Sequence, residues 1–162
     1  MAGSVYAESC KIDDPDRYIE SVFWDSVGYK PNFLKALEEY NIGLLKTEKD
    51  EDYSIYEVYN RDKKIEGYVL CVNQTYYSHK NMQLVIALDK KRTIRNIFYK
   101  RLNVESADLF TGDFINQFLT KNIKNIDKEK FRDYSQTEED KEIYFKTIFA
   151  VKKGLFLLDL FI

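Results

Sequence analysis

The period of the hydrophobic residues changes twice along this chain. Between residues 14 and 43 apolar residues recur at helical spacing, in two short stretches. From residue 53 to residue 101 they form short runs typical of strands, separated by polar turns. Beyond residue 113 helical spacing returns and continues to the end. The pattern predicts a central sheet flanked by helices from both ends of the chain.

Two short helices are predicted before the sheet, and each begins at a proline. Asp14 followed by Pro15 is a good helix start, because Asp can cap the first turn and proline fits the first helical position. Apolar residues recur at helical spacing as far as Val27, after which Gly28 supplies a stop. Pro31 opens the second helix, which is predicted to end near residue 43.

Four runs rich in β-branched and aromatic residues make up the predicted sheet. They are Tyr53–Tyr59, Ile65–Asn73, Met82–Asp89 and Ile94–Arg101. Short polar connections between consecutive strands imply antiparallel hairpins. We therefore predict a four-stranded antiparallel meander.

Two more helices are predicted after the sheet, at Asp113–Asn122 and from near Thr137 to the end of the chain. Helices on both sides of a meander define an α+β fold. We expect residues 13–162 to form a single domain and residues 1–12 to form a flexible leader. Met1–Ser4 is typical of an expression scar, and Val5–Ala7 fits the small-x-small pattern before a signal-peptidase cut. The protein is therefore expected to be exported, to the periplasm or another extracytoplasmic space.

Composition narrows the function classes. The formal net charge is −2 and the isoelectric point is near 5.6, which disfavours a nucleic-acid partner. No stretch of about 18 apolar residues is present, so no transmembrane segment is expected.

Export would allow Cys10 and Cys71 to pair, but Cys10 lies in the expected leader and we predict unpaired thiols. His79 is the single histidine, so any Ser-His-Asp or Cys-His set would have to include it, and no metal site is expected. An electron carrier or a binding module is favoured over a catalyst.

Several strings, taken in order, resemble the FMN-binding domain family, which includes the G subunit of Rnf complexes and the C subunit of the sodium-pumping NADH:quinone reductase. The strings are Lys64–Tyr68, Val85–Asp89, Ile94–Ile97, Phe114–Phe118 and Ala150–Lys153. Glu105 and Ser106 correspond to a Glu-Thr pair of the family. The resemblance implies a flavin domain on the outer face of a membrane redox system.

The stretch that corresponds to the flavin-attachment string departs from the family pattern. In the family a Ser/Thr-Gly-Ala-Thr string opens the last helix, and the FMN phosphate esterifies its final threonine. Here Ser135 and Thr137 remain, while Gly and Ala are absent. The three acidic residues Glu138–Asp140 satisfy the helix dipole and would each repel a phosphate by on the order of 1 kcal/mol.

Thr137 has two alternative roles. As a helix cap its hydroxyl would accept a hydrogen bond from the backbone N–H of Glu139 or Asp140, and we favour this role over a flavin ester. Tyr76 and His79, on a predicted turn, could contact an isoalloxazine ring or could simply be polar-turn residues. Two hypotheses stay open: a binding or assembly module of a redox-associated envelope system that has lost the cofactor, or an electron-transfer flavoprotein carrying FMN, non-covalently or through Thr137.

The last predicted helix is apolar on more than one side. Val151, Leu155 and Leu158 form one stripe, and Phe149, Phe156 and Leu160 point roughly the opposite way. We expect residues 155–162 to contact either a second copy of the chain or a membrane-bound redox partner. The alternative is that the two N-terminal helices cover this side.

Overall fold

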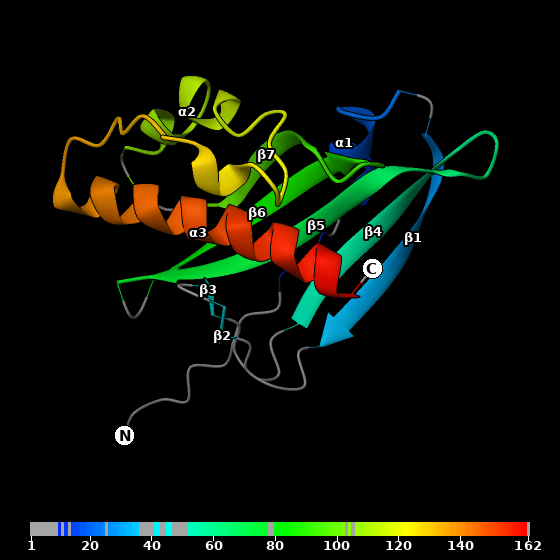
Figure 1. Cartoon of the computed structure of the whole chain (residues 1–162), viewed down its shortest axis with the longest axis horizontal. Helices are drawn as coiled ribbons and strands as arrows, with labels where there is room; N and C mark the ends of the chain where they lie inside the picture. The colour runs from blue at the N-terminus through cyan, green and yellow to red at the C-terminus, as the bar shows by residue number, and fades with distance from the viewer. Residues whose placement is uncertain are drawn as a thin grey trace.

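The computed structural model describes residues 10, 12, 14–24, 26–35, 41–42, 45–46, 52–77, 80–102, 104 and 106–161 (Figure 1). The elements are α1 (Pro15–Glu20), β1 (Ser26–Lys35), β2 (Asn41–Ile42), β3 (Leu45–Lys46), β4 (Asp52–Asn60), β5 (Ile65–Tyr76), β6 (Lys80–Asp89), β7 (Ile94–Arg101), the 3-10 helix η1 (Ala107–Phe110), α2 (Asp113–Asn116), the 3-10 helix η2 (Ile126–Lys128) and α3 (Glu138–Phe161). The α+β class is confirmed.

The main sheet has five antiparallel strands in the order β1-β4-β5-β6-β7, and β2 and β3 form a separate small hairpin. The meander of β4 to β7 matches the four predicted strands, but the predicted count of four is wrong, because β1 adds a fifth strand. The first predicted helix is also shorter than expected, since α1 ends at Glu20 and β1 begins at Ser26. The predicted helix that begins at Pro31 is wrong, because this residue lies in β1 opposite Tyr56. A proline has no N–H to donate, which an edge strand such as β1 tolerates. Apolar residues at 29, 33 and 34 fit helical and extended spacing about equally well, so the local pattern could not exclude a helix.

The long helix α3 packs across one face of the sheet (Figure 1). The helix and sheet approach closely at Gly154, since a Cβ atom on it would lie 2.7 Å from Ile86 Cδ1 and 3.1 Å from Val72 Cγ2. Aromatic residues from η1 and α2 close the same core, with Phe114 edge-on to both Phe110 and Phe118. The helix therefore owes its position to contact with the sheet over most of its length.

The predicted helix over residues 113–122 is shorter than expected. Only Asp113–Asn116 is α-helical, and turns follow. The backbone N–H of Ile94 donates to the carbonyl of Lys121, and the N–H of Thr120 donates to the carbonyl of Ile94. The segment thus uses its backbone groups to pair with the start of β7, and a longer helix could not make these bonds.

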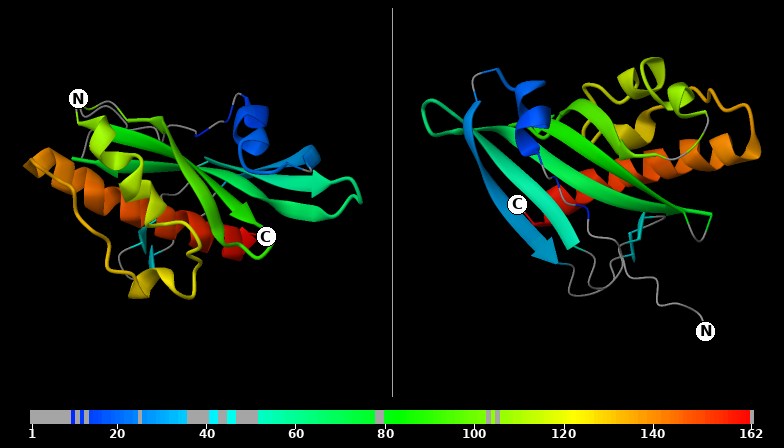
Figure 2. Two further views of the ribbon diagram at one scale, coloured as in Figure 1. Left: turned by 90° about the horizontal axis from the view of Figure 1, so that it is seen from above. Right: turned by 180° about the vertical axis from the view of Figure 1, so that it is seen from behind.

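The other face of the sheet carries α1 and the residues before it, as Figure 2 shows from above. Cys10 and Cys71 form a disulfide, with a Cα–Cα distance of 5.5 Å, so the expectation of unpaired thiols is wrong. Cys10 is buried against the sheet and accepts a hydrogen bond from Ser54 through its carbonyl, while the Ile12 carbonyl accepts one from Tyr56. The packed core therefore reaches Cys10 and Ile12, before the domain start expected at residue 13.

Candidate functional site

The amino end of α3 is closed by a reciprocal pair of hydrogen bonds. The backbone N–H of Asp140 donates to Thr137 Oγ1 over 3.1 Å, and the N–H of Thr137 donates to Asp140 Oδ2 over 3.2 Å. This arrangement is a capping box with Asp in place of the usual Glu or Gln. The predicted capping role of Thr137 is confirmed.

The carboxylate of Asp140 is the best-bonded polar group in this region. Its side chain is almost fully buried, at 1% exposure. It accepts hydrogen bonds from the Gln136 and Thr137 backbone N–H groups and from the Ser106 hydroxyl. Burial alone would raise the Asp140 pKa, but these bonds together bring it below its ordinary value. The sequence pattern placed Asp140 in the first turn but did not show that it points inward to Ser106.

This geometry does not fit an FMN phosphate on Thr137. A phosphate at a helix amino end needs free backbone N–H groups, and those of Gln136, Thr137 and Asp140 are already used within the protein. Asp140 also holds a negative charge beside Thr137, which would repel a phosphate attached there.

Of the six residues predicted as cofactor contacts, four are in the described part of the chain. Thr137 and Ser106 meet at Asp140, and Ser135 lies in the segment just before α3 with its hydroxyl buried and without a hydrogen-bond partner. Tyr76 ends β5 at 2% exposure, and burial raises its pKa although the nearby Lys80 opposes the shift. His79 and Glu105 lie outside the described residues.

An ion pair between the first residue of β6 and the first turn of α3 lies beside Tyr76. Lys80 Nζ lies 3.1 Å from Glu139 Oε1 and within 6.0 Å of the centroids of the Tyr76 and Tyr77 rings. Because both partners of this ion pair are partly exposed, it joins the first residue of β6 to α3 but contributes little to stability. The predicted residues that are described thus gather around the start of α3.

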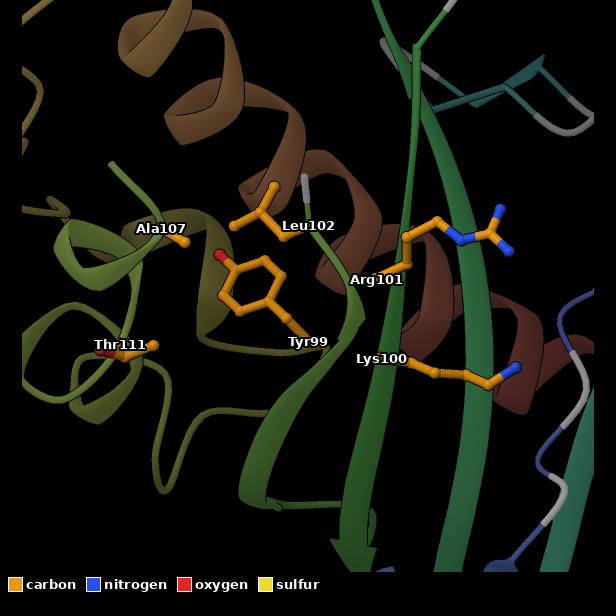
Figure 3. A pocket seen from close by; sticks show the side chains of 6 residues that line it. All are labelled: Tyr99, Lys100, Arg101, Leu102, Ala107 and Thr111. Atoms are coloured by element: carbon orange, nitrogen blue, oxygen red, sulfur yellow. The ribbon is translucent and has the colours of Figure 1, made fainter. Parts of the chain in front are cut away.

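A cavity of about 520 Å³ lies nearby, between the end of β7 and η1. Figure 3 shows Tyr99 and Leu102 directed toward the segment with Ala107 and Thr111, while the charged ends of Lys100 and Arg101 point away. The Tyr99 hydroxyl is 2.9 Å from Thr147 Oγ1 on α3, and burial raises the Tyr99 pKa well above its ordinary value. The side chains that point into the cavity are therefore uncharged. The lining residues include no acidic side chain that could act with a base in catalysis. Among the described residues, no three His, Cys, Asp or Glu side chains are grouped so that they could hold a metal ion.

The outward side of α3 carries a row of large apolar side chains. Phe145 and Leu160 are 45% and 43% exposed, and Phe149 and Phe156 between them are half-buried. These four residues, the outer row, share one side of the helix because spacings of four and seven residues return to nearly the same direction. Three of them were predicted to point away from the sheet-facing stripe. Phe145 was missed, although it lies one turn before Phe149.

Comparisons of this chain with protein-family models, with curated proteins and with solved structures find no match.

Proposed function

We propose that this protein is an extracytoplasmic binding or assembly module that works without a flavin and binds its partner through the outer row of α3. The observation that carries the proposal is the outer row itself. Single exposed apolar residues are common on protein surfaces, but four large apolar side chains on one side of a helix, two of them exposed and two half-buried, are typical of an interaction site. Aromatic residues also contribute most to the affinity of protein interfaces.

The disulfide supports the extracytoplasmic setting. Structural disulfides form and persist in oxidising compartments and are rare in the reducing cytosol. Cys10 and Cys71 are both buried at 1% exposure or less, so their bond joins the N-terminal segment to the sheet. A redox-associated membrane system as the setting rests on the family resemblance alone.

The closed amino end of α3 supports a function without flavin. Thr137 Oγ1 already accepts the Asp140 N–H, and the Asp140 carboxylate already accepts the Thr137 N–H that a phosphate could otherwise use. The competing function, an electron carrier with FMN, predicts visible absorption bands after incubation with FMN, or an FMN mass increment on Thr137. Either result would remove the cofactor-free part of the proposal.

Site-specific photo-crosslinking tests the binding surface. A benzophenone side chain at Phe145 should give crosslinked adducts in cells that make the protein naturally. The matched control is the same group at Tyr29, an aromatic residue of β1 that is 39% exposed. Adducts at Phe145 and few at Tyr29 are expected. Equal yields at both positions, or none at Phe145, would contradict the proposed surface.

A further inference from the structure

We propose that the partner of the outer row is a second copy of this chain, with the two α3 helices packed antiparallel across a two-fold axis. This inference rests on the proposed function in that it names the partner of the same surface. It does not depend on the absence of flavin.

The spacing of the outer row is the first reason. Phe145, Phe149, Phe156 and Leu160 are separated by four, seven and four residues, which is the same order in both directions. An antiparallel copy therefore sets Phe145 opposite Leu160 and Phe149 opposite Phe156, so that each of the four meets an apolar side chain. A two-fold interface needs this kind of self-complementary surface.

The charges at the ends of α3 select the antiparallel orientation. Glu138, Glu139 and Asp140 occupy its first turn. Of these, Glu138 is exposed, Glu139 pairs with Lys80 and Asp140 points inward. Two parallel helices would bring their Glu138 side chains side by side, whereas antiparallel helices separate them by more than the helix length of 24 residues, about 36 Å. The antiparallel arrangement also opposes the two helix dipoles.

Lys152 lies near the proposed axis and would approach its counterpart. Its Nζ is 2.9 Å from Asp127 Oδ1 of η2 in the same chain, so its charge is already balanced. The neighbouring Lys153 is buried and donates to the Asn73 carbonyl, which keeps it out of the row. These two lysines therefore do not oppose the contact.

The outer row is accessible but small. Two described elements lie beside α3, since β3 contacts the helix and Asp127 of η2 pairs with Lys152, but Phe145 and Leu160 at the two ends of the row stay 45% and 43% exposed. In Figure 1 neither element crosses in front of the helix. The row extends over 15 residue steps, or about 22 Å, and its four side chains are already partly covered. A stable dimer buries about 800 Å² on each partner, and interfaces below about 1,200 Å² in total are weak. The structure thus points to a reversible dimer that dissociates on dilution.

Sedimentation velocity of the oxidised full chain over a wide concentration range tests the inference. The expected result is a shift from monomer to dimer with increasing concentration. Phe145→Glu and Leu160→Glu should each weaken the association about tenfold or more, because one interface apolar group becomes charged. Both positions are more than two-fifths exposed, so the variants should fold, as circular dichroism would check. Tyr29→Glu, on the edge strand β1, is the control and should leave the dimer intact.

Crosslink mapping then tests the orientation. A benzophenone at Phe145 should attach near residue 160 of the other copy if the helices are antiparallel, and near residue 145 if they are parallel. A chain that stays monomeric at every concentration, or a dimer that Tyr29→Glu weakens as much as Phe145→Glu does, would overturn the inference. If such a monomer still forms Phe145 adducts with another protein, the self-association fails and the proposed binding surface stands. A dimer that also binds FMN leaves the self-association intact and removes the cofactor-free function.

Discussion

The two faces of the sheet are covered in different ways. On one face the 24-residue helix α3 packs with η1 and α2, and its core includes Phe110, Phe114 and Phe118, each at 1% exposure or less. On the other face the only described helix is α1, which has six residues. A helix this short cannot fold by its own propensity and has little area to bury. On the α1 face the disulfide therefore provides stability that apolar contacts provide on the α3 face.

The comparison also separates the roles of the two faces. The α3 face is stabilised by the buried inner side of a helix whose outer side carries the exposed Phe145 and Leu160. On the α1 face Phe23 packs directly over Gly67, whose missing side chain leaves the room, since a Cβ on Gly67 would lie 2.5 Å from the Phe23 ring. The α1 face therefore holds the N-terminal segment against the sheet, whereas the outer row on the α3 face is the binding surface that we propose.

Loss of the disulfide should have the largest effect. In the double variant Cys10→Ser with Cys71→Ser, the free energy of unfolding should fall by about 4 kcal/mol, because a closed loop with a sequence separation of 61 no longer restricts the unfolded chain. Urea unfolding of the wild type and the variant measures the difference. Hydrogen exchange should accelerate in α1 more than in α3. Equal acceleration in both helices would show that the two faces do not differ as described.

A larger side chain at Gly154 should break the other face. Gly154→Val places atoms where Ile86 and Val72 already lie, and overpacking of this kind costs about 1–3 kcal/mol. Gly28→Val is the matched control, because nothing lies within 4 Å of a Cβ at Gly28 and valine suits a strand. Thermal unfolding should show a lower midpoint for Gly154→Val alone. A similar loss in both variants would mean that close helix packing is not what holds α3.

The features that could be predicted from sequence were those set by neighbouring residues. The four strands of the meander follow from runs of strand-forming residues bounded by polar turns, and the cap follows from Thr137 and Asp140 being three residues apart. Features that depend on distant partners were missed or misjudged. Pro31 starts a helix or sits in an edge strand depending on whether β4 lies beside it. Cys10 pairs with Cys71 because the chain just before α1 lies against β5. No pattern of neighbouring residues in the sequence indicates this contact.

The cap itself should contribute less than either face. Thr137→Ala should lower the free energy of unfolding by about 1 kcal/mol, the usual cost of losing a capping hydroxyl. Thr137→Ser keeps the hydroxyl and should recover most of the loss. Chemical unfolding of the three proteins measures both values. If the serine variant is as unstable as the alanine variant, the hydroxyl is not what stabilises the start of α3.

The smallest expected effect is a pH dependence from Asp140, which tests whether the start of α3 is held by charge as well as by the cap. Its pKa in the folded protein lies below the ordinary value of 3.8, because the hydrogen bonds from Ser106, Gln136 and Thr137 outweigh the opposing effect of burial. A group with a lowered folded pKa binds fewer protons in the folded state than in the unfolded state. Its contribution to stability is therefore fully present above the ordinary pKa and is lost as the pH falls through the lower, folded value. Asp140→Asn cannot titrate, so its stability should be lower near neutral pH and should fall less steeply below about pH 4 than that of the wild type. Unfolding free energies of both proteins between neutral and acidic pH give the two slopes. Identical slopes would show that Asp140 is not held as a carboxylate by these bonds, and the start of α3 would then depend on the Thr137 hydroxyl alone.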